Sequence, residues 1–293
     1  MTTEPKIEAH ATLTAEQQAQ AHALAATCNQ LEGLDLKVAT EFPATAHSTE
    51  RNAFLCSADD TLIGYCALDR NSATEAELCG MVAPAHRRRG IGGALLAAVR
   101  AESQRTGLRR LLIICEQASQ SGRAFVATTG ARLTFSEYRL VLGTLVRRPP
   151  AVPDLTLTLA GPADADAVAH VTAVAFGDPE DLMQARIRLD IHDLSQRFYV
   201  ARLGGEAVAT LKVYPYDIHT AGIYAFGVLP GRRGRGIGRQ VLTEICARLQ
   251  AEGRTRILLE VETTNTTAHA LYRSCGFEER TTYGYYALDV PQA

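Results

Sequence analysis

Long apolar runs and an excess of charge of one sign are both missing from this chain of 293 residues. No run of about eighteen apolar residues occurs, and the first ten residues, MTTEPKIEAH, are polar, so neither a membrane span nor a secretory signal is expected. Its 30 Lys and Arg residues nearly balance 32 Asp and Glu residues, which is unlike the basic excess of a nucleic-acid binder. We therefore expect a cytoplasmic globular protein that binds neither membranes nor nucleic acid.

Cysteine and histidine residues at the spacings typical of metal ligands are also missing from the sequence. The seven cysteines form no Cys-x-x-Cys pair and lie mostly within apolar strand or helix patterns, so we interpret them as small buried hydrophobes. The eight histidines show no metal-ligand spacing either. We therefore propose no metal and no disulfide framework.

The most informative stretch is residues 223–238, IYAFGVLPGRRGRGIG. Its β-branched and aromatic first half predicts a strand that stops at Pro230, and a basic, glycine-rich turn then leads into a helical pattern near Ile237. Glycines allow close approach of a ligand to the backbone, and a helix start presents unpaired N–H groups and a positive dipole end. The turn therefore predicts a phosphate or pyrophosphate site.

Two common phosphate motifs do not fit this turn. A P-loop requires Lys and then Ser or Thr after its last glycine, whereas Arg239 and Gln240 follow Gly238. A Rossmann fingerprint requires glycine or alanine where Arg239 stands. The remaining description is Arg/Gln-x-x-Gly-x-Gly/Ala after a strand that ends in Val-x-Pro.

The same features occur twice. Gly90, Glu116 and Gly130 each have an identical residue 146 positions later, and Val82 and Pro84 likewise precede Val228 and Pro230 by 146 positions. Chance identity at so many special positions is improbable, so we interpret the chain as a duplicated domain. The segment 147–153, RRPPAVP, is stiff and cannot continue a helix, which suits a linker between a first domain of residues 1–146 and a second of residues 154–293.

Hydrophobic periodicity predicts an α/β chain in which the order of elements in the first half is repeated in the second. The predicted helices cover residues 14–31, the turn to 104, 121–128, 162–175, 180–190, the turn to 250, and 266–274. The predicted strands cover residues 52–56, 62–68, 76–82, 109–115, 135–142, 155–159, 198–203, 207–213, 223–228, 256–261 and 283–288.

A second motif follows the strand at 256–261. Asn265, Ala268, Leu271, Tyr272, Gly276 and Phe277 match every fixed position of the pattern Asn-x-x-Ala-x-x-Leu-Tyr-x-x-x-Gly-Phe. With the glycine turn, this pattern resembles the GNAT family of acyl-CoA-dependent N-acetyltransferases, and the resemblance covers nearly the whole chain as two tandem copies. It implies that each copy is a mixed, mostly antiparallel sheet flanked by helices, with acetyl-CoA entering where two parallel strands splay.

The resemblance also implies roles for particular residues. The turn would hold the pyrophosphate of coenzyme A, the preceding strand would offer its backbone to the pantetheine arm, and Asn265 would bond the pantetheine. The implied cofactor-binding residues of the second half are Phe226, Gly227, Val228, Arg233, Gly234, Arg235, Gly236, Ile237, Gly238 and Asn265. Those of the first half are Val82, Arg87, Arg88, Arg89, Gly90, Ile91 and Gly92.

Direct acyl transfer requires a base for the substrate ammonium, a polarised carbonyl and a proton for the departing thiolate. In the family, the tyrosine at Tyr272 faces the sulfur, and we take it as the acid, with a backbone N–H near Gly227 or Val228 at the carbonyl. Many members place a glutamate on the strand before the turn, where this chain has none. The ribosomal-protein Nα-acetyltransferase branch uses the Glu of Leu-Glu-Val, which here is Glu260. Glu262, His219 and Asp217 are the further candidates for the base, and a strand glutamate can also simply face solvent or pair with an arginine.

The first half departs from this pattern, because Ser119, Val126 and Ala131 stand where Asn265, Tyr272 and Phe277 would be. Valine has no proton to give, so we expect a degenerate first domain that can bind a CoA-like ligand and a catalytic second domain. A non-catalytic acyl-CoA sensor remains the alternative from another class.

The acceptor amine is not readable from the sequence. Tandem members resembling mycothiol synthase acetylate a cysteinyl amine, and other small-molecule amines or a protein N-terminus are equal contenders. Two tyrosine-rich segments, residues 214–219 and 283–286, are candidates for lining the acceptor pocket or are ordinary amphipathic surface. The oligomeric state is likewise not predicted.

Overall fold

A computed structural model gives the structure of the chain and describes residues 5–42, 49–70 and 72–291. The chain forms two compact units, and each is described by itself. The first comprises Met1–Glu137 with Thr281–Ala293, and the second comprises Tyr138–Arg280. The two units therefore do not follow the predicted boundary at residue 146.

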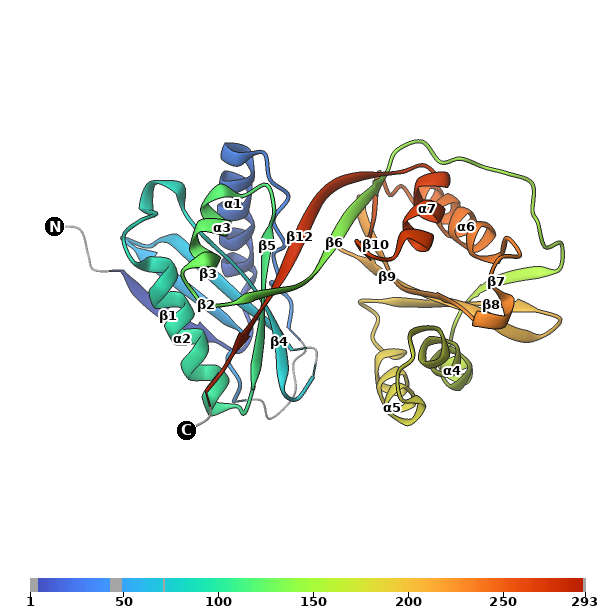
Figure 1. Ribbon diagram of the computed structural model, residues 1–293, viewed down its shortest axis with the longest axis horizontal. Coiled ribbons are helices and arrows are strands. Elements are labelled where there is room, and N and C mark those ends of the chain that lie inside the picture. The colour runs from blue at the N-terminus through green and yellow to red at the C-terminus, as the bar shows by residue number, and fades with distance from the viewer. Residues whose placement is uncertain (1–4, 43–48, 71, 292–293) are drawn as a thin grey trace. The chain divides into compact units, whose positions relative to one another are not determined.

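The elements appear in nearly the predicted order (Figure 1). The first half holds β1 (Lys6–His10), α1 (Ala15–Glu32), β2 (Ala53–Ala58), β3 (Thr61–Arg70), β4 (Glu75–Val82), α2 (Ile91–Arg105), β5 (Arg110–Glu116), α3 (Gln120–Ala127) and β6 (Arg132–Leu142). The second half holds β7 (Leu155–Leu159), α4 (Ala165–Phe176), α5 (Glu180–Asp190), β8 (Arg197–Leu203), β9 (Glu206–Pro215), β10 (Thr220–Val228), α6 (Ile237–Ala251), β11 (Arg256–Glu262), α7 (Thr266–Ser274) and β12 (Phe277–Asp289). Only β1 was not predicted.

Local chemistry explains where several helices begin. Thr14 caps α1, because its hydroxyl accepts the Gln17 N–H while the Gln17 side chain accepts the Thr14 N–H. Asn265 caps α7, its side-chain oxygen accepting the Ala268 N–H at 3.1 Å. By contrast, α2 and α6 start without a side-chain cap, after glycines in the left-handed region.

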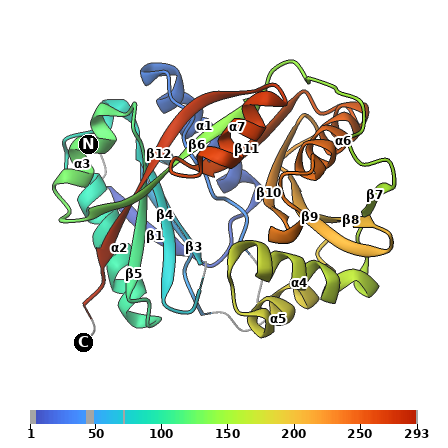
Figure 2. The same cartoon turned by 45° about the vertical axis from the view of Figure 1, so that its right-hand side comes forward.

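Each unit is a mixed sheet covered by helices on both faces. In the first unit the strand order is β1-β2-β3-β4-β5-β12, and in the second it is β6-β11-β10-β9-β8-β7. Most neighbours are antiparallel, and β4–β5 and β10–β11 are the parallel pairs. Successive residues of β8 alternate between faces: Phe198 and Val200 pack with α4, and Tyr199 and Ala201 pack with α6 (Figure 2).

The last strand of each sheet comes from the other half of the chain. Residues Tyr283–Asp289 of β12 pair antiparallel with β5 in the first unit, whereas β6 lies beside β11 in the second. The two compact units therefore exchange these strands and differ from the predicted boundary at residue 146. Hydrophobic alternation marks a strand but does not say which sheet accepts it, so the exchange could not be read from the sequence.

Candidate active site

The predicted phosphate turn of the second unit has the expected geometry. Gly234 and Gly236 adopt φ values of 75° and 84°, and α6 begins at the next residue, Ile237. The first backbone hydrogen bond of α6 runs from the Gln240 N–H to the Gly236 carbonyl at 3.0 Å. The N–H groups of the residues between them have no intrahelical partner, so they are available to an anion.

Arg233 of the turn donates hydrogen bonds to backbone carbonyls of the second unit. Its Nε donates to the Val228 carbonyl at 2.9 Å and its Nη2 donates to the Ala175 carbonyl at 3.0 Å. The guanidinium therefore ties the turn to the end of β10 and to α4. Both partners are neutral, so its positive charge remains next to the helix N-terminus.

The parallel strands β10 and β11 splay beside this turn. Their pairing runs from Thr220↔Arg256 to Ile223↔Leu259 and stops there. On the other edge of β10, the register with β9 shifts between Tyr224 and Gly227, and Ala225 within this bulge has a φ of 46°. A positive φ at a residue with a Cβ is uncommon, and bulges are frequent next to active sites because they re-aim the strand.

A backbone donor at the end of β10 faces the gap between β10 and β11. The Leu229 N–H donates to Val208 of β9 at 3.0 Å. Successive N–H groups of a strand point to opposite edges, so the Val228 N–H faces the side where β11 has diverged. This is the position predicted for polarising a thioester carbonyl.

Tyr272 lies at the same place, on the buried face of α7. Its side chain is 7% exposed, and its ring centroid lies 6.5 Å from that of Phe226 on β10 and 6.3 Å from that of Phe277. Burial raises the pKa of the hydroxyl to about 12, and the nearby Cys275 contributes less. Within the described residues the hydroxyl has no hydrogen-bond partner, so it is a protonated donor at neutral pH that is available to a ligand.

Glu260, the predicted base, lies on β11 and is engaged in an ion pair. Its Oε1 lies 3.0 Å from both Nε and Nη2 of Arg139, and the two side chains are 10% and 9% exposed. Arg139 belongs to β6, the strand that the first half contributes to this sheet. The pairing with an arginine that the sequence left open is thus present, and the catalytic role of Glu260 stays a prediction.

Tyr216 and Tyr224 meet near Glu260, a contact that the sequence analysis did not predict. The Tyr224 ring occupies the space beside Gly222, where an added Cβ would lie 2.5 Å from Tyr224 Cε2. Its hydroxyl contacts the hydroxyl of Tyr216, and burial, followed by the effects of Tyr216 and Glu260, raises the pKa of Tyr224 well above its usual value. The signal that could have indicated this site is the glycine at 222, since an isolated glycine within a strand often marks a close approach.

The other tyrosine-rich candidates do not lie at this site. Tyr283 and Tyr285 are 1% and 2% exposed and belong to the core of the first unit, because β12 pairs with β5 there. Asp217 accepts the His219 and Thr220 N–H groups at 2.6 and 2.7 Å, so it shapes the turn before β10. The interpretation of residues 283–286 as an acceptor lining for the second domain is therefore wrong.

The first unit retains the turn but has valine in place of the buried tyrosine. Between β4, α2 and α3 lies a cavity of about 440 Å³. The register between β4 and β3 continues without a bulge, and Val126, 4% exposed, stands where the second half has Tyr272. Arg87 donates to Val82 as Arg233 does to Val228, but its Nη1 donates to Glu32 at 2.7 Å, and Glu32 also accepts from Ser119 and Ser121. A carboxylate thus neutralises the turn's arginine.

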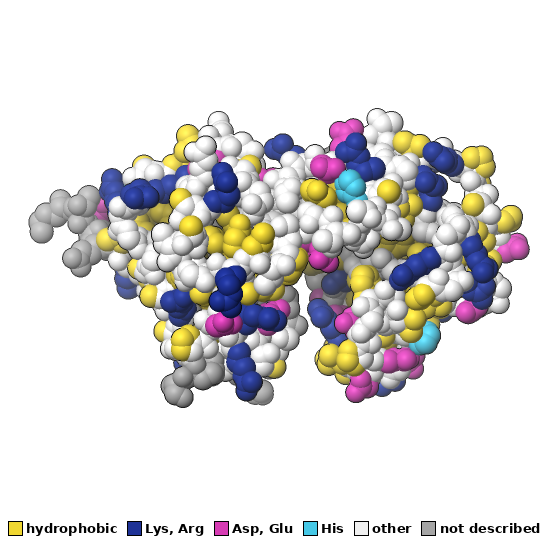
Figure 3. Space-filling view, viewed as in Figure 1, with side chains coloured by type: hydrophobic (Ala, Val, Ile, Leu, Met, Phe, Trp, Pro, Cys, Tyr) yellow, Lys and Arg dark blue, Asp and Glu magenta, His cyan; other side chains and the backbone are white. Residues whose placement is uncertain are grey.

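Other features of the described residues are consistent with a globular protein of balanced charge. Basic and acidic side chains are interspersed on the face drawn in Figure 3, without a broad area of one sign. All seven cysteines are free thiols, and six of them are buried, which fits their interpretation as small buried hydrophobes. In the residues that the structure describes, no helix combines the length and the apolar character needed to cross a membrane.

A splayed pair of parallel strands, with a glycine turn at a helix start and a buried tyrosine beside the splay, defines the class of acyl-CoA-dependent acyltransferases. The chain belongs to the Acetyltransferase (GNAT) family, whose sequence pattern matches residues 18–130 and 166–277, one match in each half. It is thus an N-acetyltransferase with two GNAT copies, and the family uses acetyl-CoA.

Relatives share this arrangement. The chain is 30% identical over 299 residues to a mycothiol acetyltransferase of Salinispora tropica, covering 94% of each chain. It is 30% identical over 241 residues to the mycothiol acetyltransferase of Cellulomonas flavigena, covering 74% of this chain and 68% of the relative. Among solved structures, a GCN5-related N-acetyltransferase from Sphaerobacter thermophilus superposes with a TM-score of 0.76 at 20% identity, covering 98% of this chain and 97% of the other. A tandem GNAT protein from the clavulanic acid biosynthesis pathway gives a TM-score of 0.72 at 17% identity, covering 99% and 100%.

Proposed function

We propose that the second unit transfers the acetyl group of acetyl-CoA directly to a primary amine, and that the first unit is degenerate. The observation that carries this proposal is the coincidence, in the second unit alone, of the β10 bulge and the buried Tyr272 hydroxyl beside the Val228 N–H. The first unit has an unbulged β4 and Val126.

In the proposed reaction, the neutral amine attacks the thioester carbonyl carbon, the new C–N bond forms and the C–S bond breaks. The Val228 N–H stabilises the oxyanion, an effect typically worth about 10²- to 10³-fold in rate. The Tyr272 hydroxyl donates to the departing sulfur. The pyrophosphate would contact the amides at the start of α6, and the Asn265 amide group, whose oxygen caps α7, would face the pantetheine arm.

We propose Glu260 as the group that takes the proton from the ammonium, directly or through water. The carboxylate lies beside Arg139 and near the Tyr224–Tyr216 pair, on the sheet face opposite α6 and α7. The ring and hydroxyl of Tyr224 fill the space that a side chain at position 222 would otherwise occupy. The acceptor amine would therefore meet Glu260, Tyr216 and Tyr224.

The acceptor is proposed to be a small-molecule amine. The relatives named mycothiol acetyltransferase favour a cysteinyl amine of the mycothiol type, and a protein N-terminus is the alternative. The experiment is a screen of amines and N-terminal peptides with acetyl-CoA on the full chain, following free thiol. Turnover that Val126→Ala leaves unchanged and Tyr272→Phe lowers supports the proposal.

The competing proposal, a non-catalytic acyl-CoA sensor, is favoured by one observation only: the first unit has a cavity and a glycine turn without an acid. Tight binding of acetyl-CoA to the full chain without turnover of any amine in the screen would support the sensor and contradict the enzyme proposal.

A further inference from the structure

The segment expected to be a simple linker is held against the start of α6. The Val152 N–H donates to Gln240 Oε1 at 3.0 Å, and Gln240 Nε2 donates to the Val152 carbonyl at 3.1 Å. A Cβ added to Gly236 would lie 2.7 Å from the Cβ of Ala151, so the segment also touches the phosphate turn. These contacts fix the position of the preceding residues along the helix.

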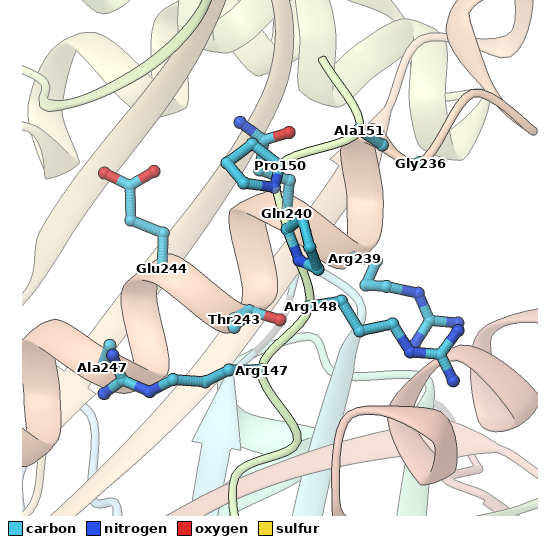
Figure 4. A pocket seen from close by; sticks show the side chains of 11 residues that line it. Arg147, Arg148, Pro150, Ala151, Gly236, Arg239, Gln240, Thr243, Glu244 and Ala247 are labelled. Carbon is cyan, nitrogen blue, oxygen red and sulfur yellow. The ribbon is translucent and has the colours of Figure 1, made fainter. Parts of the chain in front are cut away.

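The segment and the solvent face of α6 enclose a pocket of about 300 Å³ that reaches the phosphate turn at Gly236. Figure 4 shows that Arg148 of the segment and Arg239 of α6 extend toward the same side of the pocket. Arg147 extends instead toward Ala247, at the far end of the pocket. The pocket is thus lined by two guanidinium groups that extend toward one side of it.

The charge of these two arginines is not neutralised by the protein. Arg239 Nη1 donates to the carbonyl of Ser274 at 3.0 Å, a neutral partner, and Arg148 has no ion pair among the residues that the structure describes. Glu244 is the one acid of the lining, and it pairs with Arg248 on its own helix. Two like charges that line one pocket repel each other, so a bound dianion would stabilise this arrangement.

A phosphomonoester suits this pair, since it carries nearly two negative charges at neutral pH and accepts paired hydrogen bonds from guanidinium groups. Coenzyme A carries a phosphomonoester on its ribose, close to the pyrophosphate. We propose that Arg148 and Arg239 bind the 3′-phosphate of coenzyme A, so that the chain segment between the two halves completes the cofactor site of the second unit. This inference rests on the proposed function, which places the pyrophosphate at the turn beside Gly236.

The test compares coenzyme A with 3′-dephospho-coenzyme A by titration calorimetry on the full chain at low salt. Charge-assisted hydrogen bonds from an exposed arginine predict that the wild type binds coenzyme A about tenfold more tightly. Arg148→Gln should remove this preference by weakening coenzyme A alone. Arg147→Gln, which removes the same charge one residue away, should keep the preference.

Several outcomes would overturn the inference. Equal weakening of both ligands by Arg148→Gln, or an unchanged preference, would show that the side chain does not meet the 3′-phosphate. Inorganic phosphate binding that depends on Arg148, while the preference for coenzyme A does not, would assign the pocket to a separate phosphate compound. Equal binding of the two ligands by the wild type would reject this inference alone, whereas no binding of either would reject the proposed function as well.

Discussion

Replacing Tyr272 with phenylalanine removes one hydroxyl and leaves the packing intact. The ring contacts with Phe226 and Phe277 persist, and the lost hydroxyl has no partner among the described residues. No buried group is orphaned, so the free energy of unfolding at neutral pH should change by less than about 1 kcal/mol.

The size of the expected rate loss follows from the pKa. At about 12, Tyr272 is a weaker acid than an alkyl thiol by about 3.5 pKa units, so full proton transfer to the thiolate is uphill by about 5 kcal/mol. The hydroxyl would therefore act mainly as a hydrogen-bond donor to the developing charge. Such a bond is worth about 1.5–3 kcal/mol, and we expect Tyr272→Phe to lower kcat by about 10- to 150-fold with little change in the KM for acetyl-CoA.

The assay is release of free coenzyme A with the amine identified in the screen, across a range of pH. Tyr199→Phe is the matched control, because Tyr199 is a buried tyrosine of the same core on β8. A Tyr272→Phe variant with full activity, or a Tyr199→Phe variant with the same loss, would refute the assignment of the acid.

Tyr272→Phe should also make the stability of the protein less sensitive to alkaline pH. The folded state keeps the Tyr272 proton up to about pH 12, whereas the unfolded chain loses it from about pH 10. Stability present below pH 10 is therefore lost as the pH rises from 10 to 12, by up to about 2.7 kcal/mol. Urea unfolding should show a smaller alkaline loss in Tyr272→Phe than in the wild type, and an equal loss would mean that the phenol is not buried.

Three further predictions concern the base, the turn and the exchanged strands. Glu260→Gln should lower kcat/KM at least about 100-fold, whereas a folded variant with wild-type rates would leave the Arg139–Glu260 ion pair with a purely structural role. Gly236→Ala should lower the thermal stability more than Gly90→Ala. The left-handed φ costs about 1–2 kcal/mol at both positions, but only the Cβ added at position 236 meets the segment 147–153. Equal losses of stability would contradict that contact. A fragment of residues 138–280 should fold, and one of residues 148–293 should aggregate because it lacks β6, the strand that lies beside β11. Cooperative unfolding of the fragment 148–293 would argue against the exchange.

Much of this architecture could be predicted because local chemistry determines it. Thr14 and Asn265 have the side chains that cap helices, and the glycines at 234 and 236 mark a turn that needs left-handed residues. These features depend on neighbours within a few positions, so the sequence shows them directly.

The rest depends on contacts between distant segments. The exchange of β6 and β12 pairs strands that alternate in the same way in either sheet, and the contact of Arg139 with Glu260 joins residues 121 positions apart. The bulge at Ala225 could have been suspected from Gly227 within the strand, where an added Cβ would lie 2.6 Å from Ala175 of α4. That the Val228 N–H faces the splay could be seen only from the pairing of both neighbouring strands.

The most direct test of the account is a crystal structure of the full chain with acetyl-CoA. We predict that the second unit holds the cofactor, with its pyrophosphate on the N–H groups that open α6 and its sulfur within hydrogen-bond distance of the Tyr272 hydroxyl. A structure in which the second unit is empty while the first unit holds the cofactor, or in which the sulfur lies far from this hydroxyl, would contradict the proposed acetyl transfer.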